Sequence, residues 1–510
     1  MDFNIIILGF GVIGSESLFE LIRGLKDKNT NIAIIEKNIG NIPGGVAYSK
    51  LNSKHGFFNN PLRLSNLDFI KWIKRKQNIE KLIRFIKINP SYDLDNWLSK
   101  NIDFKQKKIS KFSEIYFPRL FYSFFLKDKI IKSLKFANKK SINIKFYQAN
   151  VTDIKKKNQL IFSSLNKFIE FKPMIKNGKL SFKKMKKKIT SISSSKAIIG
   201  NGILPPKHIY ENKNFRNENY IWDFYSEGGT NNLINKLRKL GKNKKLIKLV
   251  FIGNKAGLLE AIPKLENIIN KSKKKFKIIS VAKSSLSLEK AEKSKKLNSY
   301  RFRFFTSKNI KNLNKSQKIL ELLSKEFYYA KKSGHNKYDV WTLVLKKNII
   351  SKCFKRLSIK EKVKYDDKIF PLIRNLTRYT YPETIYSKER LQENKILTFI
   401  KDKVIKIKKN KKSILLITEK NHKILSDILI NVSGPVDLNS MAREVPFIQS
   451  LKRISKNYNH RGFFADKNFR IDENIYAPGT LSSNFNPNRL TLIRAVSENS
   501  KKAIKHMLKN

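Results

Sequence analysis

The hydrophobic pattern of the chain begins with short apolar runs that alternate with stretches of helical period. A run of aliphatic residues closes a predicted strand, Asn4–Leu8, and a predicted helix follows with Leu18, Leu21 and Ile22 on one face. A second apolar run, Asn31–Glu36, predicts the next strand. A strand, a helix and a strand in this order predict a β-α-β unit with parallel strands, the repeating element of α/β folds.

Three glycines join the first predicted strand to its helix. Gly9, Gly11 and Gly14 have the spacing G-x-G-x-x-G, and Glu36 ends the second strand. In a dinucleotide site the first glycine makes the tight turn, the second lets the backbone approach the pyrophosphate, and the third lets the helix pack closely. The acid binds the ribose hydroxyls, and the helix N-terminus faces the phosphates. We therefore predict a dinucleotide site; a glycine-rich turn in an ordinary β-α-β unit is the alternative.

The same pattern returns in the middle of the chain. A strand is predicted over Leu246–Ile252, and a further parallel strand ends at Ala282. Gly253 and Gly257 lie between the first of these strands and its helix, but Lys255 occupies the place of the second glycine. No acid ends the second strand. A weak nicotinamide dinucleotide site and a purely structural α/β domain both stay open for this unit.

The remaining segments contain further strands and one helical stretch. Ile142–Ile154 alternates as a strand that could present the Val151 backbone to an adenine, and Lys196–Lys207 is a strand that ends at a glycine-containing turn. Residues 290–385 are expected to form a lysine-rich, mainly helical insertion. Strands return after this insertion and lead to the apolar segment Asp427–Pro435.

The charge of the chain is strongly basic, with a formal net charge of +68 over 510 residues. Its 108 basic residues comprise 89 lysines and 19 arginines, and the lysines are spread along the whole chain with abundant Ile and Asn. This composition is typical of an AT-rich genome. Nucleic-acid readers rely on arginine forks and stacking aromatics instead. We therefore predict a diffuse solvated surface and no specific nucleic-acid partner.

Other classes of site find little support in the sequence. The single cysteine, Cys353, excludes an internal disulfide and a cluster of cysteine metal ligands, and the six histidines show no ligand spacing. No metal is therefore expected. The chain shows neither a signal peptide nor an apolar run of about 20 residues, so we predict a cytoplasmic protein without a membrane span.

Several blocks of the N-terminal third resemble a known family. In order along the chain they are Gly44–Ser49, Phe57–Ser65, Phe69–Ile73 and Phe117–Leu126. Together they resemble the FAD/NAD(P)-binding protein family that lies near flavin-dependent N-hydroxylases and two-dinucleotide monooxygenases. The resemblance extends to the segments Lys196–Lys207 and Asp427–Pro435, where relatives pass between their two domains, and to the C-terminal strand, turn and helix. Thr480 stands where many flavoproteins have Asp.

The resemblance implies an α/β fold in which a Rossmann-like FAD-binding domain holds a second, inserted Rossmann-like domain. The expected parts are the FAD-binding domain over residues 1–240, an NAD(P)-binding-like domain over 245–425, and a return to the first domain over 426–510. The implied cofactors are FAD and, weakly bound, NADP(H). The predicted cofactor-binding residues, from the motifs and the resemblance together, are Gly9, Gly11, Gly14, Glu36, Asn59, Arg119, Val151, Gly202, Gly253, Gly257, Gly434 and Gly479.

The predicted function is that of an FAD-dependent oxidoreductase, such as an NADPH-dependent monooxygenase of a small molecule. The alternative is a flavin- or nucleotide-binding protein without turnover, whose second site is degenerate. Neither a catalytic acid or base nor the substrate follows from the sequence. The oligomeric state is equally open.

Overall fold

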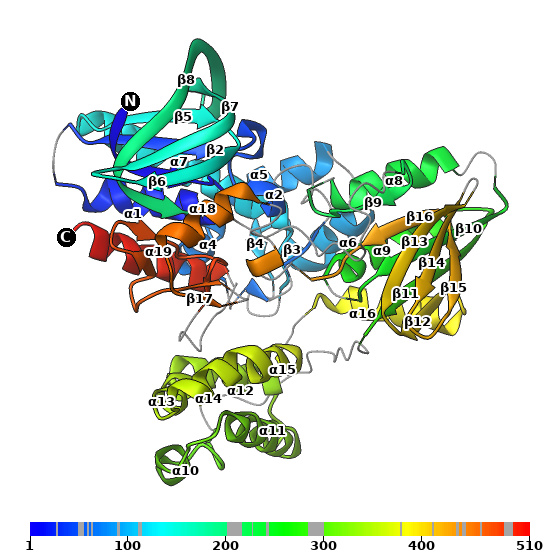
Figure 1. Cartoon of the computed structure of the whole chain (residues 1–510). Helices are drawn as coiled ribbons and strands as arrows, with labels where there is room; N and C mark the ends of the chain where they lie inside the picture. Colours follow the sequence, from blue (N-terminus) through cyan, green and yellow to red (C-terminus); the bar gives the residue numbers. More distant parts are fainter. Residues whose placement is uncertain are drawn as a thin grey trace. The chain divides into compact units, whose positions relative to one another are not determined.

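Figure 1 shows the computed structural model of the chain. The structure describes residues 1–26, 29–48, 56–58, 61–62, 65–88, 92–110, 115–200, 217–226, 228–240, 244–254, 256–283, 300–377, 380–410, 413–434, 438–440, 445–459, 462–483 and 493–510. By its internal contacts the chain divides into two compact units. Unit 1 comprises Met1–Leu286, Tyr386–Ser482 and Thr491–Asn510, and unit 2 comprises Ser287–Ile385 and Ser483–Leu490.

The first sheet of unit 1 has a parallel core. Its strands pair in the order β20-β8-β1-β2-β5, and all of these pairings are parallel. They are β1 (Asp2–Leu8), β2 (Asn31–Glu36), β5 (Asn143–Gln148), the last part of β8 (Lys179–Ile199) and β20 (Ile475–Tyr476). The two strands predicted at the N-terminus are confirmed. Their carboxyl ends lie at one edge of the sheet, where ligands bind in open α/β folds.

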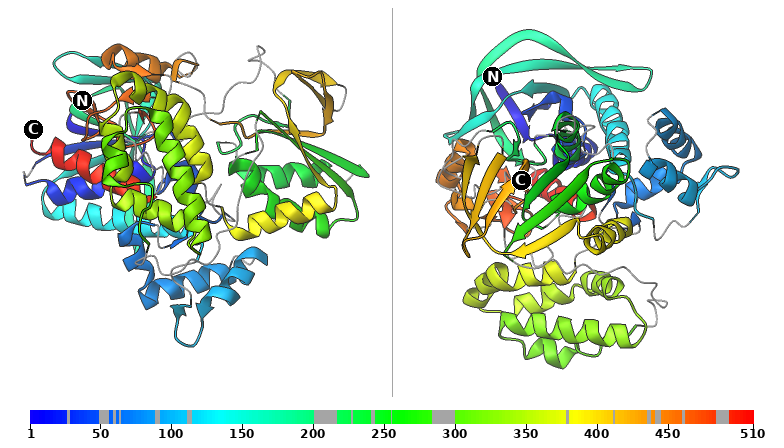
Figure 2. Two further views of the ribbon diagram at one scale, coloured as in Figure 1. Left: turned by 90° about the horizontal axis from the view of Figure 1, so that it is seen from below. Right: turned by 90° about the vertical axis from the view of Figure 1, so that its right-hand side faces the viewer.

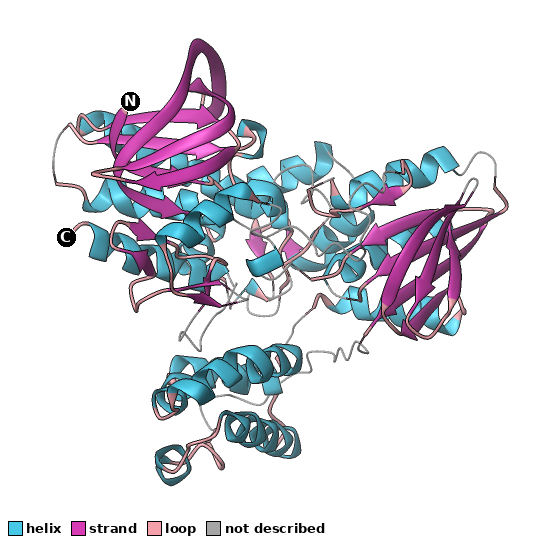
Figure 3. Cartoon of the chain, in the orientation of Figure 1, coloured by secondary structure: helices cyan, strands magenta, loops and turns pink. Residues whose placement is uncertain are grey.

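The same sheet continues into an antiparallel part. β6 (Val151–Lys156) pairs with β7 (Leu160–Lys176), and β7 pairs along most of its length with β8. The prediction of one strand over Ile142–Ile154 is wrong, because Ala149 and Asn150 separate β5 from β6. β6 pairs with β7 rather than with a parallel neighbour, and pairing of this kind is not visible in local alternation. β7 and β8 arch away from the parallel core as a two-stranded ribbon (Figures 1 and 3).

Helices cover the parallel core of the first sheet. α1 (Val12–Gly24) packs against α7 (Arg119–Lys139) and α19 (Ile493–Met507). The apolar face of α1 predicted from Leu18, Leu21 and Ile22 is fully buried against the sheet. Shorter elements surround these helices: η1 (Ile39–Asn41), α2 (Gly45–Tyr48), α4 (Leu67–Ile73), α5 (Lys76–Ile88), α6 (Tyr92–Asn101), β3 (Ile102–Asp103) and β4 (Lys108–Ile109).

A second sheet in unit 1 has five strands, all parallel, in the order β12-β11-β10-β16-β9. They are β9 (Tyr220–Ile221), β10 (Leu246–Ile252), β11 (Lys275–Ala282), β12 (Leu397–Lys401) and β16 (Ile428–Asn431). An antiparallel meander follows β12 and consists of β13 (Val404–Asn410), β14 (Ser413–Thr418) and β15 (Lys423–Ser426). Three helices accompany the five-stranded sheet, namely α8 (Gly229–Leu240), α9 (Ala256–Asn270) and α16 (Pro382–Glu393).

Two neighbouring strands at one side of this sheet come from outside the expected central domain. β9 precedes the expected boundary at 240–245, and β16 follows the one at 425. β16 pairs in parallel with β10, and β9 extends the sheet from β16, so both strands contribute hydrogen bonds to the second sheet. The domain boundaries stay predictions, but these two strands belong by pairing to the five-stranded sheet.

The remaining part of unit 1 contributes short elements between the two crossings and the C-terminus. They are α18 (Pro446–Ile454), β17 (Tyr458–Asn459), β18 (Gly462–Phe464), β19 (Arg470–Asp472) and β21 (Ser482–Ser483). The boundary between the units falls inside β21, with Ser482 in unit 1 and Ser483 in unit 2. β19 pairs with β20 and extends that edge of the first sheet, whereas α18 packs against β6. Apolar side chains of this segment add to the core of the sheet.

Unit 2 is helical in its described part, as the sequence predicts for residues 290–385. Its helices pack against one another around an apolar core (Figure 2) and are α10 (Ser307–Lys311), α11 (Ser316–Lys332), α12 (Lys337–Lys346), α13 (Ile349–Lys355), α14 (Ile359–Lys364), the π-helical turn η4 (Tyr365–Ile369) and α15 (Phe370–Leu376). Cys353 lies inside this core. Its burial raises the pKa of the Cys353 thiol to about 12. Of all described helices, none combines the length and apolarity needed to cross a bilayer.

Candidate functional site

The glycine turn between β1 and α1 has the geometry that the motif predicts. Gly9 has a φ of +86°, in the region that favours glycine, and its N–H donates to Ile35 O at 2.8 Å. A Cβ on Gly14 would lie 2.3 Å from Gly9 O, so Gly14 allows the helix to approach the strand. Gly11 is the N-cap residue of α1 and offers no side-chain hydrogen bond to this helix end. The turn therefore presents the positive end of α1 at the carboxyl edge of the sheet.

Gly11 differs from its two neighbours in the space around it. A Cβ built on Gly11 would make only ordinary contacts, the shortest being 3.5 Å to Gly45 Cα. Its φ of −76° is negative, so no left-handed conformation requires glycine here. The space inside the fold therefore admits a Cβ at this position, whereas close approach of a ligand to the backbone would not.

Glu36 lies at the end of β2 beside the same turn. One carboxylate oxygen accepts the Phe10 N–H at 2.7 Å, and the other accepts the Asn38 N–H at 3.3 Å. Burial raises the pKa of Glu36, and these two backbone N–H groups oppose that effect. A carboxylate has about four acceptor positions, so Glu36 holds the turn in place and keeps capacity for further hydroxyl donors.

Two further glycine-containing segments close over the turn, and the predicted site residues omit both. Gly200, directly after β8, donates its N–H to Leu8 O at 2.7 Å, and a Cβ there would lie 2.6 Å from Gly9 O. Gly44 and Gly45 have φ values of +100° and +65°, and Gly44 forms a parallel bridge with Gly11. Three chain segments thus meet at the turn without side chains between them. The doublet Gly44–Gly45 was visible in the sequence, but its contact with Gly11 was not.

Glu16 forms a buried polar centre two residues after Gly14. Its side chain is fully buried, and one carboxylate oxygen accepts hydrogen bonds from Lys129 Nζ at 2.6 Å and Ser497 Oγ at 3.0 Å. The other accepts from Asn66 Nδ2 at 3.2 Å and Tyr122 Oη at 3.3 Å. Burial and the charge of Glu16 raise the pKa of Tyr122 well above its usual value. Glu16 thereby connects the first turns of α1 to α7, to α19 and to the residue that caps α4.

Arg119 begins α7 and lies in a second buried charge pair. Its Nη1 donates to Glu260 Oε2 at 2.7 Å, and its Nε donates to Phe57 O at 2.9 Å. The two side chains are only 12% and 9% exposed. Burial by itself would lower the pKa of Arg119, but the charge of Glu260, its hydrogen bond and the nearby Tyr225 and Tyr48 together outweigh burial, and the net effect raises the pKa. Arg119 therefore joins the first-sheet side of unit 1 to α9; its predicted role in cofactor binding stays a prediction.

The second glycine turn packs against the returning chain. Gly253 has a φ of +103°, and a Cβ there would lie 2.9 Å from Val432 O. A Cβ on Gly257 would lie 2.6 Å from Val432 Cγ1 and 3.3 Å from Phe224 Cδ1. Both glycines thus serve the close packing of β10 and α9 on the segment after β16. Lys255, on which the expectation of weak binding depends, lies outside the described residues.

Three of the other predicted site residues, Val151, Gly434 and Gly479, lie at or just beyond the ends of strands. Val151 opens β6 and is half-buried, on the antiparallel part of the sheet rather than on a parallel strand. Gly434 follows β16 and Asn431, whose side-chain oxygen accepts the Ser433 N–H and hydroxyl. Gly479 follows β20, and its carbonyl accepts the Ser482 hydroxyl at 3.0 Å. Asn59 and Gly202 lie outside the described residues.

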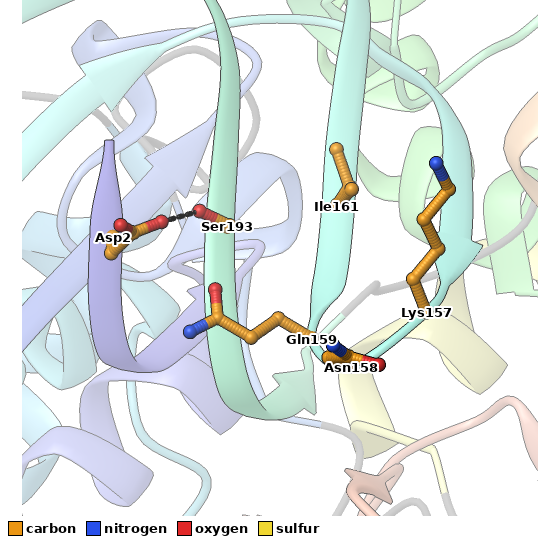
Figure 4. A pocket seen from close by; sticks show the side chains of 6 residues that line it. All are labelled: Asp2, Lys157, Asn158, Gln159, Ile161 and Ser193. Atoms are coloured by element: carbon orange, nitrogen blue, oxygen red, sulfur yellow. Dashed lines mark hydrogen bonds between the residues drawn. The ribbon is translucent and has the colours of Figure 1, made fainter.

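A shallow pocket lies far from the glycine turn on the first sheet (Figure 4). The pocket is lined by Asp2, Ser193, Ile161 and the β6–β7 turn at Lys157–Gln159. The hydroxyl of Ser193 donates a hydrogen bond to the carboxylate of Asp2. Asp2 begins β1 whereas the glycine turn follows its end, so the pocket lies at the amino edge of the parallel core. It is therefore not the dinucleotide site. No group of three or more His, Cys, Asp or Glu side chains suited to a metal occurs among the described residues.

With this geometry established, the comparison with known families identifies the N-terminal part of the chain. Residues 6–167 match the FAD-NAD(P)-binding family. The matched segment contains the first glycine turn, Glu36 and Arg119, and it confirms the resemblance inferred from the sequence blocks. No curated protein sequence matches the chain.

Solved structures extend the likeness to the whole chain. The ornithine N-hydroxylase of Kutzneria sp. 744, solved with FAD, NADP⁺ and L-ornithine, has a TM-score of 0.54 at 10% identity, covering 100% of this chain and 99% of that one. The FAD-bound cadaverine monooxygenase of the desferrioxamine pathway of Erwinia amylovora has a TM-score of 0.51 at 10% identity, covering 99% and 95%. At this identity the likeness shows the fold: a Rossmann-like domain with a second, inserted Rossmann-like domain, as predicted.

Proposed function

We propose that the protein is an FAD-dependent oxidoreductase that binds FAD at the turn of Gly9, Gly11 and Gly14. The observation that carries the proposal is the open position at Gly11, where a Cβ would make only ordinary contacts within the fold, at the N-terminus of α1. Glu36 lies beside the same turn with acceptor capacity to spare, which suits ribose hydroxyls. The family match over residues 6–167 supports the same assignment.

The residues of the turn would each do one task when the cofactor is bound. The N–H groups of the first turn of α1 would donate to the pyrophosphate, and Glu36 would accept from the ribose. Gly44, Gly45 and Gly200 keep the surrounding backbone close, and Glu16 holds α19 against α1. Bound FAD would supply the redox chemistry, taking up a hydride and passing electrons to oxygen or a second acceptor.

The second glycine turn is the proposed site of the hydride donor, NADPH. Its support is the β10–α9 arrangement of a Rossmann unit, with Gly253 and Gly257 at the close contacts. The sequence feature against tight binding is Lys255, which puts a long side chain where the backbone should approach the pyrophosphate. We therefore expect weak binding of NADPH and slow reduction of the flavin.

The substrate class can be sought first among primary amines. The two structures named above are an ornithine N-hydroxylase and a cadaverine monooxygenase. A monooxygenase acting on an amine is thus the finer proposal. A nucleotide-binding protein without turnover is the second candidate, and Lys255 and Thr480 are the features that favour it.

A graded substitution at Gly11 tests the cofactor site. In apoprotein titrated with FAD, Gly11→Ala should weaken binding moderately and Gly11→Val strongly, because each added methyl narrows the approach to α1. Both variants should unfold at the temperature of the wild-type apoprotein, since a Cβ fits at Gly11. Unchanged FAD affinity in a folded Gly11→Val protein would refute the site.

Anaerobic addition of NADPH separates the two candidate functions. Bleaching of the bound flavin in this experiment, followed in an aerobic assay by oxygen uptake that L-ornithine or cadaverine accelerates, would support a monooxygenase. A protein that binds FAD but is reduced by neither NADPH nor NADH would support the candidate without turnover.

A further inference from the structure

The ribbon formed by β7 and β8 ends in an Asn-Gly turn and has two different faces. Asn177 and Gly178 have φ values of +48° and +68°, as a two-residue hairpin turn requires. Paired residues of an antiparallel ladder point to the same side, and the side alternates along each strand. We define the outer face by three successive alternate pairs, namely Lys172 with Lys183, Met174 with Ser181, and Lys176 with Lys179.

The inner face of the ribbon is attached to the core of the first sheet. Phe171, Leu180 and Phe182 pack against the buried cluster that includes Phe146, and the rings of Phe146 and Phe182 lie 5.1 Å apart. The ribbon is therefore held in place through one side. All six residues of the outer face are exposed on the other side.

The outer face concentrates positive charge without compensation. Its four lysines form two pairs directly across the ladder, and like charges in this position destabilise a sheet. Within the described part of the chain, the side chains of these lysines make no ion pair. Glu170 is the one acid in the whole of β7 and β8. An anionic surface placed against the outer face would relieve this repulsion.

Exposed aliphatic side chains lie among these charges. Met174 is 45% exposed on the outer face, and Leu165 is 74% exposed nearer the base of the ribbon. Ile175 pairs with Leu180 and therefore lies on the inner face. Between the pairs of Ile169 and Phe171 the ladder is irregular, and β8 there carries the exposed residues Met185, Lys186 and Lys187. Aliphatic groups gain little from a phosphate backbone, but they gain from entering the boundary between lipid headgroups and acyl chains.

The residue types also disfavour nucleic acid as the partner of this ribbon. β7 and β8 contain no arginine, and their phenylalanines are buried or half-buried, so neither guanidinium forks nor exposed stacking rings are present. Lysines whose methylene stems lie along apolar surface while the ammonium groups reach outward are typical of membrane interfaces. We propose that the outer face of the β7–β8 ribbon docks on the surface of a membrane that contains anionic phospholipid.

Vesicle binding by the full-length protein tests this proposal. The vesicles are phosphatidylcholine alone and phosphatidylcholine mixed with phosphatidylglycerol, at an ionic strength of about 0.15 M, where distant charges are screened. Each lysine close to an anionic bilayer contributes roughly fivefold in affinity. The variant with Lys172, Lys176, Lys179 and Lys183 all changed to Gln should therefore bind the mixed vesicles at least about tenfold more weakly.

The chain offers a control with the same loss of charge. Lys271, Lys273, Lys275 and Lys277 are exposed and close together in sequence beside the second sheet. Changing these four to Gln should alter vesicle affinity less than about threefold, because they lie outside the ribbon. Neither variant should unfold at a lower temperature than the wild type, since the ribbon variant loses only repulsive pairs.

A third variant tests the apolar contribution. Met174→Ser keeps every charge and should also reduce binding to the mixed vesicles. Equal losses in the ribbon and control variants would show that only total charge matters and would overturn the proposal. So would absent vesicle binding by the wild type, or a ribbon variant that loses affinity for duplex DNA but not for vesicles.

Discussion

The buried pair between Arg119 and Glu260 leads to a quantitative prediction for Glu260→Gln. The substitution keeps the volume of the side chain and removes its charge. Arg119 would then remain buried, with its Nε still bound to Phe57 O but without a counter-charge at Nη1. We expect unit 1 to lose stability, because removing the counter-charge of a buried cation is costly.

The expected magnitude follows from the burial of the pair. Breaking a buried ion pair by removing one partner costs about 3–5 kcal/mol. Since Arg119 and Glu260 keep 12% and 9% of their side-chain exposure, we expect the lower end, about 3 kcal/mol. Unit 1 has about 400 residues, so with an unfolding entropy of about 2.1 cal/mol/K per residue this corresponds to a fall of roughly 3–4 °C in the melting temperature.

Thermal unfolding of the apoprotein provides the assay. The double variant Arg119→Met with Glu260→Met should recover most of the loss, because apolar side chains of similar size often replace a buried pair without penalty. The control is Glu419→Gln in the exposed pair with Lys403, whose side chains are 64% and 46% exposed. That pair should be worth less than about 1 kcal/mol.

The cycle of single and double variants can refute this reasoning. A melting temperature for Glu260→Gln within the range of the Glu419→Gln control would show that the pair is not buried as the structure has it. Additive losses in the double variant would show that Arg119 and Glu260 do not interact.

Four further outcomes are expected. Burial lowers the pKa of Lys264 to about 7, so the folded state binds this proton less readily than the unfolded state does. Lys264→Met should therefore raise the melting temperature at pH 7. This gain should fade as the pH rises toward about 10.5, where the lysine of the unfolded state also loses its proton. Because burial raises the pKa of Cys353 to about 12, a thiol reagent at pH 8 should label it only after denaturation. Lys129→Met should cost about 3–5 kcal/mol in urea unfolding by leaving Glu16 buried without its cation, and an unchanged midpoint would contradict that role. Lys255→Gly should speed reduction of the flavin by NADPH in stopped-flow absorbance; rapid reduction of the wild type without gain in the variant would contradict the role given to Lys255.

The first glycine turn was predictable because its chemistry is local. Gly9, Gly11 and Gly14 lie within six residues, and Glu36 reaches the turn from the strand that any right-handed β-α-β unit places next to β1. The apolar runs likewise predicted β2 and β10 to the residue, since buried parallel strands are continuous hydrophobic segments.

The remaining contacts depend on long-range pairing that one sequence does not encode locally. Glu260 is 141 residues from Arg119, and Ser497 is 481 residues from Glu16, so no spacing rule connects either pair. Gly200 lies at the turn because β8 pairs with β1 up to Ile199, the residue before it. The predicted residue in this segment, Gly202, lies outside the described residues. The two faces of the ribbon became visible only with the register of β7 and β8.

The most direct test of the central assignment is the cofactor content of the purified full-length protein. We predict the visible absorption bands of an oxidised flavin and, after denaturation, release of about one FAD per chain, identified by its mass. A colourless protein that also fails to bind added FAD, or one that releases a different nucleotide, would contradict the assignment of the Gly9–Gly14 turn.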